Sequence, residues 1–140
     1  MAQSYINLTT LIPSYYFTTI RTQLTTDFTT LSITNDWTNN GSGKFTYTGK
    51  NRVFYTYIRA KQSSSNVVFW CSLYLYRNNT TILDFNRRLF SGSGANDAAI
   101  MVGPIVINTD DFFYVYVLND TGSSSGTSIN FQIDLIITAY

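Results

Sequence analysis

The chain has 140 residues, the length of one domain, and its nine basic and eight acidic residues leave a formal net charge of +1. This balance excludes the dense positive surface that binding to nucleic acid or to an anionic membrane requires. Histidine and glutamate are absent, and one cysteine, Cys71, cannot form a disulfide within the chain or a cysteine-rich metal site. The usual general bases are therefore missing, and we expect no enzyme activity, no catalytic residue, no metal and no cofactor.

The composition predicts an all-β fold. Thr, Ser, Asn, Tyr and Phe are abundant whereas Ala is scarce, and the abundant types favour strands and turns over helices. Turn residues interrupt the apolar segments at short intervals, which is typical of a sandwich or a barrel. No apolar run approaches the ~18 residues of a membrane helix, and the N-terminus lacks the pattern of a signal peptide. We therefore expect a protein that is made in the cytoplasm and does not partner a membrane.

The N-terminal segment differs in texture from the rest of the chain. Residues 11–17 are apolar without clean alternation, and residues 18–34 are rich in threonine. We predict a strand at residues 29–34 and interpret residues 1–28 as an arm that precedes a domain of residues 29–140. Such an arm can add to the sheet edge of a neighbouring protein, and the predicted docking residues are Leu11, Ile12, Tyr15 and Phe17. The alternatives are a loosely packed terminus or a segment that completes the domain's own sheet.

Strands are predicted along the rest of the chain, separated by turns rich in Gly, Ser or Asn. Alternation is cleanest near the C-terminus, where every second residue from 129 to 137 is apolar. The Gly103-Pro104 pair predicts a bend in an edge strand. Short polar connections predict that the first three strands pair with one another in antiparallel order. The predicted strands are residues 44–48, 52–61, 67–76, 98–107, 112–118 and 129–137, with two short strands at 82–85 and 88–90.

Three of these strands are apolar on both faces, although one face of a strand in an antiparallel sandwich normally meets water. In strand 52–61, Phe54 and Ile58 point one way, and the aromatic residues between them point the other way. Eight aromatic residues are then left outside the core, and hiding about 100 Å² of each removes ~800 Å² from water, more than a monomer normally exposes in one patch. We predict a subunit interface made of Tyr55, Tyr57, Trp70, Tyr74, Tyr76, Phe112, Tyr114 and Tyr116. A platform on which sugars stack is the alternative.

Paired charges give weaker signals. Asp110 and Asp111 are adjacent, but calcium needs six to eight oxygen ligands and no repeated acidic loop supplies them. We therefore predict that this pair caps a turn. The basic pair Arg87-Arg88 is interpreted as a solvated turn or a contact between subunits.

Two stretches of the chain resemble the jelly rolls of bacteriophage and large-DNA-virus fibre heads and capsid-associated proteins. The first contains GKFTYTG at residues 43–49, RVFYTYI at residues 52–58 and the apolar run from residue 67 to Tyr76. The second contains DDFFYVYV at residues 110–117, followed by a Ser/Gly loop and the alternating strand. The resemblance covers about residues 37–140. Such domains share the tumour-necrosis-factor-like trimeric jelly roll, in which aromatic residues of one sheet line the three-fold axis.

The resemblance implies an all-β, antiparallel jelly-roll sandwich that forms a homotrimer on the surface of a virus particle, beside other capsid or fibre proteins. The implied function is structural: a minor capsid protein that acts as a decoration, vertex or short-fibre component. The alternative is a fibre head that binds a host-surface glycan or receptor and mediates host attachment. Neither function calls for nucleic acid as a partner.

Overall fold

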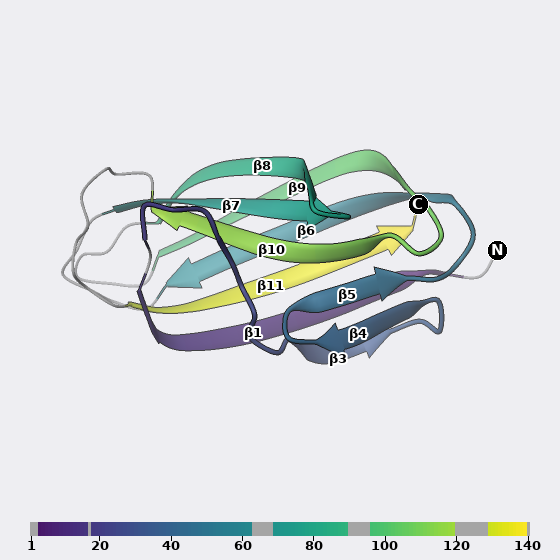
Figure 1. Ribbon diagram of the computed structural model, residues 1–140, viewed down its shortest axis with the longest axis horizontal. Coiled ribbons are helices and arrows are strands. Elements are labelled where there is room, and N and C mark those ends of the chain that lie inside the picture. The colour runs from purple at the N-terminus through teal and green to yellow at the C-terminus, as the bar shows by residue number, and fades with distance from the viewer. Residues whose placement is uncertain (1–2, 17, 63–68, 90–95, 120–128, 140) are drawn as a thin grey trace.

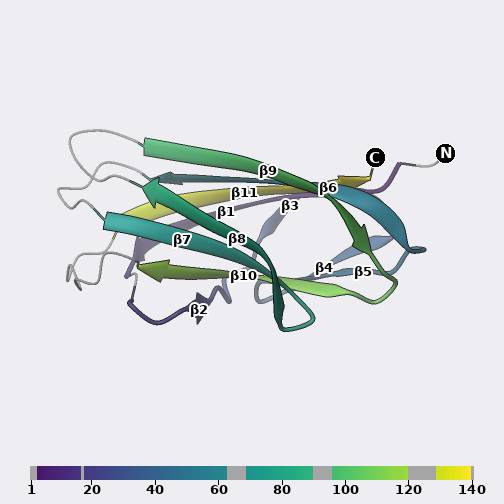
Figure 2. The same ribbon diagram turned by 90° about the horizontal axis from the view of Figure 1, so that it is seen from above.

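The computed structural model describes residues 3–16, 18–62, 69–89, 96–119 and 129–139. These residues form eleven strands in two antiparallel sheets, which pack face to face (Figures 1 and 2). Within these ranges no helix is long and apolar enough to cross a membrane. The fold is therefore the all-β jelly-roll sandwich that the sequence predicts.

The first sheet, sheet A, has the strand order β3-β1-β11-β6-β9. Its register brings buried side chains into rows across the sheet: Leu8 pairs with Leu135, which in turn pairs with Ile58. The last strand in the chain thus lies between the first strand and β6 (Figure 1). The bounds are β1 (Tyr5–Tyr15), β3 (Thr29–Ile33), β6 (Arg52–Gln62), β9 (Asn96–Ile107) and β11 (Ile129–Ala139).

The second sheet, sheet B, has the order β4-β5-β10-β7-β8. The short strand β2 pairs with β10 as well, through Tyr116 and Val117, whereas β5 pairs with β10 at Phe112 and Phe113. The bounds are β2 (Thr22–Gln23), β4 (Trp37–Gly41), β5 (Lys44–Tyr47), β7 (Phe69–Arg77), β8 (Thr80–Leu89) and β10 (Phe112–Asn119).

The pairing predicted for the strands at residues 44–48, 52–61 and 67–76 is wrong. The corresponding strands β5, β6 and β7 lie in sheets B, A and B, so the chain crosses between the layers at each connection. β5 pairs with β4 and β7 pairs with β8, whereas β6 pairs with the distant β9 and β11, so a short connection does not by itself identify a partner. Residues 80–89 also form one strand, where two short ones were predicted.

Local turn chemistry was predicted more reliably. Asn78 and Asn79 both have positive φ, 50° and 67°, in the two-residue turn that joins β7 to β8, a conformation that asparagine tolerates well. Strand β9 is an edge strand of sheet A, and its register with β6 shifts at Gly103-Pro104. The predicted bend in an edge strand is therefore confirmed.

The core between the sheets centres on Trp37, whose ring lies 5.0 Å from Tyr47 and 5.6 Å from Phe54, centroid to centroid. Leu24 and Phe28, between β2 and β3, are also buried. They are held in place where the Leu24 amide donates to the Val115 carbonyl at 2.8 Å. Gly43 has φ +82°, and a Cβ there would lie 2.2 Å from the Leu24 carbonyl oxygen, so this close approach requires glycine.

The prediction of an N-terminal arm is wrong for residues 5–15. These residues form β1, which hydrogen-bonds to β3 on one side and to β11 on the other, and Ile6 and Leu8 are completely buried. The domain therefore includes β1. The alternation was hard to recognise because a threonine, Thr10, takes one inward position and Pro13 lies where the register with β11 shifts.

Candidate interaction surfaces

The structure divides the predicted interface residues between two surfaces. Tyr55 and Tyr57 lie on the outer face of sheet A, because Phe54 and Ile58 on the same strand point into the core. Sheet B carries five of the others on its outer face, namely Tyr74, Tyr76, Phe112, Tyr114 and Tyr116. Trp70 is the eighth predicted residue, and its side chain lies outside the described ones. The two faces point in opposite directions (Figure 2), so these residues do not form one patch.

The outer face of sheet A carries an apolar row across three strands. Met101, Tyr57 and Ile136 are directly paired in register on β9, β6 and β11. Met101 is 66% exposed, whereas Tyr57 and Ile136 are half-buried. The Tyr55 ring lies beside this row against Gly103, where a Cβ would come within 2.5 Å of the ring. We name Met101, Tyr57, Ile136 and Tyr55 the apolar row.

A polar row borders the apolar row on the same face. Arg59 and Asp134 are paired in register, and Asp134 pairs with Thr9 on β1. The Thr9 hydroxyl donates to Asp134 Oδ1 at 2.6 Å, and the Gln132 amide donates to the same oxygen at 3.0 Å. An apolar centre with a polar border that carries both signs of charge is the usual anatomy of a protein interface.

On sheet B, the chain itself covers part of the aromatic surface. The Arg21 guanidinium lies 3.7 Å from the centre of the Tyr74 ring and donates to the Tyr76 hydroxyl at 2.7 Å. The Tyr76 and Tyr116 rings stack at 3.9 Å, and the Tyr116 hydroxyl donates to Gln23 Oε1 at 2.8 Å. Tyr74 is consequently only 6% exposed. Much of the aromatic surplus on this face is therefore used within one subunit.

The surroundings of Arg21 and Tyr116 on sheet B also shift the pKa values of these two groups. The hydrogen bond from Arg21 to the Tyr76 hydroxyl is the main cause that raises the pKa of Arg21 above its ordinary value. Burial is the main cause that raises the pKa of Tyr116, and the neighbouring hydroxyls of Tyr76 and Tyr114 raise it further. At neutral pH the arginine is charged and Tyr116 is neutral, as each is at its ordinary pKa, and both upward shifts favour these states.

Among the described side chains, the rest of the outer face of sheet B is more open and carries a cation, Lys44. The Phe112 and Tyr114 rings are half-buried, and the Lys44 ammonium group lies 4.7 Å from the centre of the Phe112 ring. The described outward side chains of β4, β5, β7 and β10 include no carboxylate. In register, β8 places Asp84 opposite Tyr74 and Arg88 opposite Trp70, and the side chains of β8 beyond Thr81 lie outside the described ones.

The predicted docking residues of the N-terminal segment are mostly part of the domain. Ile12 is 6% exposed in the core, and the Tyr15 ring packs edge to face against Phe131 at 5.2 Å. Leu11 is 66% exposed on the outer face of sheet A. Phe17 lies outside the described residues. Docking of this segment onto another protein stays a prediction, but Ile12 and Tyr15 already pack within the domain.

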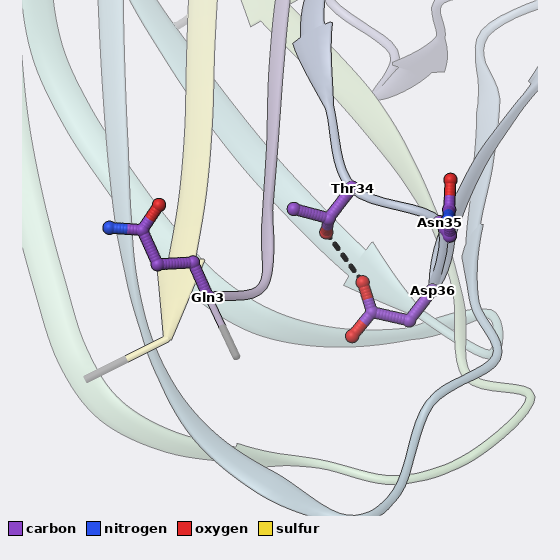
Figure 3. A pocket seen from close by; sticks show the side chains of 4 residues that line it. All are labelled: Gln3, Thr34, Asn35 and Asp36. Atoms are coloured by element: carbon purple, nitrogen blue, oxygen red, sulfur yellow. Dashed lines mark hydrogen bonds between the residues drawn. The ribbon is translucent and has the colours of Figure 1, made fainter. Parts of the chain in front are cut away.

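A hollow of about 390 Å³ lies at the end of the sandwich where the described termini meet (Figure 3). Gln3 and the connection from β3 to β4 line it, with Thr34, Asn35 and Asp36. The Thr34 hydroxyl donates to Asp36 Oδ1 at 2.5 Å. Among the described residues of this lining, Asp36 is the one ionisable side chain, and it has no base beside it there.

Asp111 caps a turn, as the sequence predicts. One carboxylate oxygen accepts the Asn108 amide at 2.9 Å, and the other accepts the Asn78 side-chain amide at 2.7 Å. Asn78 in turn accepts the Phe112 amide at 2.9 Å, which joins the β7–β8 turn to the start of β10. Across the described ranges, no three acidic or cysteine side chains come close enough together to hold a metal ion.

The sequence did not identify three residues that matter on these faces. Ile136 was not predicted to contribute to an apolar outer face. An apolar residue between Asp134 and Thr138, on the otherwise polar side of the strand, could have indicated it. Met101 lies in a strand that is apolar throughout, so its outward direction gave no signal. Arg21 contacts Tyr74 and Tyr76 only because of the fold, and no local pattern marks it.

Neither a protein-family model nor a curated protein sequence matches the chain. Solved structures match its fold over nearly its whole length. The globular domain of zebrafish complement 1qA matches with a TM-score of 0.64 and 14% identity, over 99% of this chain and 97% of that one. A crystal structure of murine APRIL matches with a TM-score of 0.63 and 12% identity, over 99% and 100%. PRD1 vertex protein P5 matches with a TM-score of 0.63 and 11% identity, over 96% of both chains. At such identities the likeness establishes the fold, a tumour-necrosis-factor-like jelly roll.

Proposed function

We propose that the protein is a structural component of a virus particle, a capsid-associated jelly roll that acts as a decoration, vertex or short-fibre protein. The observation that carries this proposal is the likeness of its fold, over 96% of both chains, to the PRD1 vertex protein. APRIL and complement 1qA share the fold. The resemblance of residues 43–76 and 110–137 to viral jelly rolls supports the viral neighbour over the other two.

The protein works as a homotrimer in this proposal, and the subunits meet through the outer face of sheet A. Met101 is 66% exposed in the single chain and lies in one row with Tyr57 and Ile136. Each Å² of apolar surface that is removed from water stabilises an assembly by about 25 cal/mol. Methionine and tyrosine are also enriched at interfaces. Sheet B is the weaker candidate, because the chain's own Arg21 and Gln23 already contact its tyrosines.

Particle incorporation tests the proposal. Particles of the virus that encodes the protein are purified by density gradient, washed at high salt and examined by quantitative mass spectrometry and electron cryomicroscopy. We expect a fixed copy number divisible by three and density at one class of symmetry axis. A protein that stays in the soluble lysate and never sediments with particles contradicts the proposed function.

Two matched variants connect incorporation to the face of sheet A. Met101→Asp places a charge in the apolar row, whereas Thr38→Asp places the same charge on an exposed position of β4 in sheet B. We expect Met101→Asp to lower the copy number in particles at least several-fold and Thr38→Asp to leave it unchanged. Equal incorporation of both variants contradicts assembly through sheet A.

A further inference from the structure

We propose that the outer face of sheet B binds an acidic glycan, a sugar chain that carries a carboxylate, at a site centred on Arg21. This inference rests on the proposed function, because a trimer that assembles through sheet A leaves sheet B on the outside of the particle. A host-surface glycan is then the partner that this face meets first.

The fold holds Arg21 in place before any ligand arrives. Its guanidinium carbon lies 3.7 Å from the centre of the Tyr74 ring, and the guanidinium donates to the Tyr76 hydroxyl. The loop that carries it is closed by two hydroxyls, since Thr18 and Thr22 both donate to the Ile20 carbonyl, at 3.0 and 2.8 Å. An ordered side chain loses little entropy when it binds, which favours recognition.

Arg21 has more N–H donors than its hydrogen bond to Tyr76 uses. A guanidinium has five N–H donors in a planar fork, and the bond to Tyr76 uses one of them. The Arg21 side chain is exposed, and among the described residues no carboxylate pairs with it. A planar fork of this kind matches the two oxygens of a carboxylate. Among the described side chains the fork therefore has no acidic partner, whereas the side chain of Asp84, opposite Tyr74 in register, lies outside them.

The face around Arg21 supplies another cation and aromatic rings. Lys44 adds a second cation on the same face, and the half-buried rings of Phe112 and Tyr114 are outward neighbours on β10. Aromatic rings offer apolar surface to the faces of sugars, and tyrosine hydroxyls offer hydrogen bonds. The described outward side chains of β4, β5, β7 and β10 carry no carboxylate, so the charge of this described part of the face complements an acidic sugar.

The other surfaces do not offer the same chemistry. The polar row of sheet A contains Asp134, whose carboxylate already accepts bonds from Thr9 and Gln132. The hollow beside Gln3 contains Asp36, and a carboxylate there repels an acidic sugar. The structure therefore points to one face of the domain and to one class of ligand.

The test uses pairs of sugars that differ in one charge. Sialyllactose is compared with lactose, and digalacturonic acid with its methyl ester, by isothermal titration calorimetry and saturation-transfer NMR on the full chain. We expect both acids to bind at least about tenfold more tightly than their neutral counterparts, as for a charge-assisted, bidentate contact. We also expect saturation transfer from tyrosine and phenylalanine protons to the bound sugars.

Variants assign the binding to this face. Arg21→Gln should reduce the affinity for the acids to that for the neutral sugars, and Arg21→Lys should restore only part of it, because a lysine lacks the planar fork. Lys44→Gln should weaken binding by a smaller factor and does not touch the Arg21 contacts. Lys61→Gln, an exposed lysine on β6 of sheet A, is the matched control and should bind as the wild type does. Near-ultraviolet circular dichroism reports whether each variant is folded.

Several results would overturn the inference. Equal binding of the acidic and neutral sugars, no binding at 10 mM sugar, or full acid binding by a folded Arg21→Gln protein each contradict it. Should Arg21→Gln fail to fold, the Arg21→Lys and Lys44→Gln results decide in its place. Incorporation into particles separates this failure from that of the proposed function: a wild-type protein that joins particles but shows no preference for acidic sugars overturns the inference and leaves the structural role intact.

Discussion

The outer faces of the two sheets are both rich in aromatic and apolar side chains, yet the chain treats them differently. On sheet B, Tyr74 and Tyr76 are covered or held by Arg21, a residue of the same chain. On sheet A, Met101 remains 66% exposed beside Tyr57. A surplus of aromatic residues on a face therefore does not by itself identify an interface. What matters is whether the same chain already covers them.

The largest expected effect concerns the strand that completes sheet A. Leu8→Ala in β1 should lower the free energy of unfolding by about 2–5 kcal/mol, because Leu8 is completely buried between the sheets. Leu11→Ala, on the exposed side of the same strand, should change it by less than about 0.5 kcal/mol. Denaturant unfolding of both variants measures the difference. Equal stability of the two variants would mean that residues 5–15 are an arm after all.

The next prediction compares the two faces in assembly. Met101→Asp should weaken self-association by about 2 kcal/mol or more, because it places a charge in the centre of an apolar contact. Thr38→Asp on sheet B should leave self-association unchanged. Sedimentation velocity at a series of protein concentrations gives both association constants. Dissociation caused by Thr38→Asp alone would move the interface to sheet B.

A smaller effect is expected where Arg21 covers sheet B. Arg21→Ala removes a cation–π contact and a hydrogen bond at an exposed site, which should cost about 1 kcal/mol of folding free energy. Oligomer mass should stay the same, because the contact lies within one subunit. Thermal unfolding followed by tyrosine fluorescence measures the stability. Loss of the oligomer in this variant contradicts the division between the two faces.

The smallest expected effect is a pH dependence on sheet B. The folded state raises the pKa of Tyr116, so the folded protein binds this proton more tightly than the unfolded chain does. Stability from this group is therefore complete below the ordinary tyrosine pKa of about 10 and is lost as the pH rises through the folded value. Between pH 8 and 11.5, the free energy of unfolding should fall less steeply with pH for Tyr116→Phe than for the wild type. Identical slopes would show that Tyr116 titrates in the folded protein as it does in the unfolded chain.

The sequence predicted most of the strands but not their partners. Strands β10 and β11 were predicted because their described inward positions are apolar, as at Phe131 and Ile133, and β6 was predicted although Thr56 takes one of its inward positions. Strand β4 was missed because Trp37–Gly41 contains Asn-Asn-Gly, a typical turn sequence. Pairing depends on contacts between distant residues, such as Leu8 with Leu135, and no local pattern records them.

The candidate surfaces were predicted in part for the same reason. The outward direction of Tyr55 and Tyr57 follows from simple alternation along β6. The division of the aromatic residues between two faces does not, because it requires the assignment of each strand to a sheet. The contact between Gln23 and Tyr116 joins residues that are 93 positions apart. The sequence alone therefore could not predict that Gln23 covers Tyr116.

Distances between spin labels test most directly whether three subunits assemble through sheet A. Thr138 on sheet A and Thr38 on sheet B are both exposed threonines on outer faces, so each can be replaced by a labelled cysteine in a Cys71→Ala background. Double electron–electron resonance should give three equal, short distances for label 138 and clearly longer ones for label 38, in a particle of three times the 15.9 kDa chain mass. Shorter distances for label 38, or a particle of 15.9 kDa without any distance, would contradict assembly through sheet A.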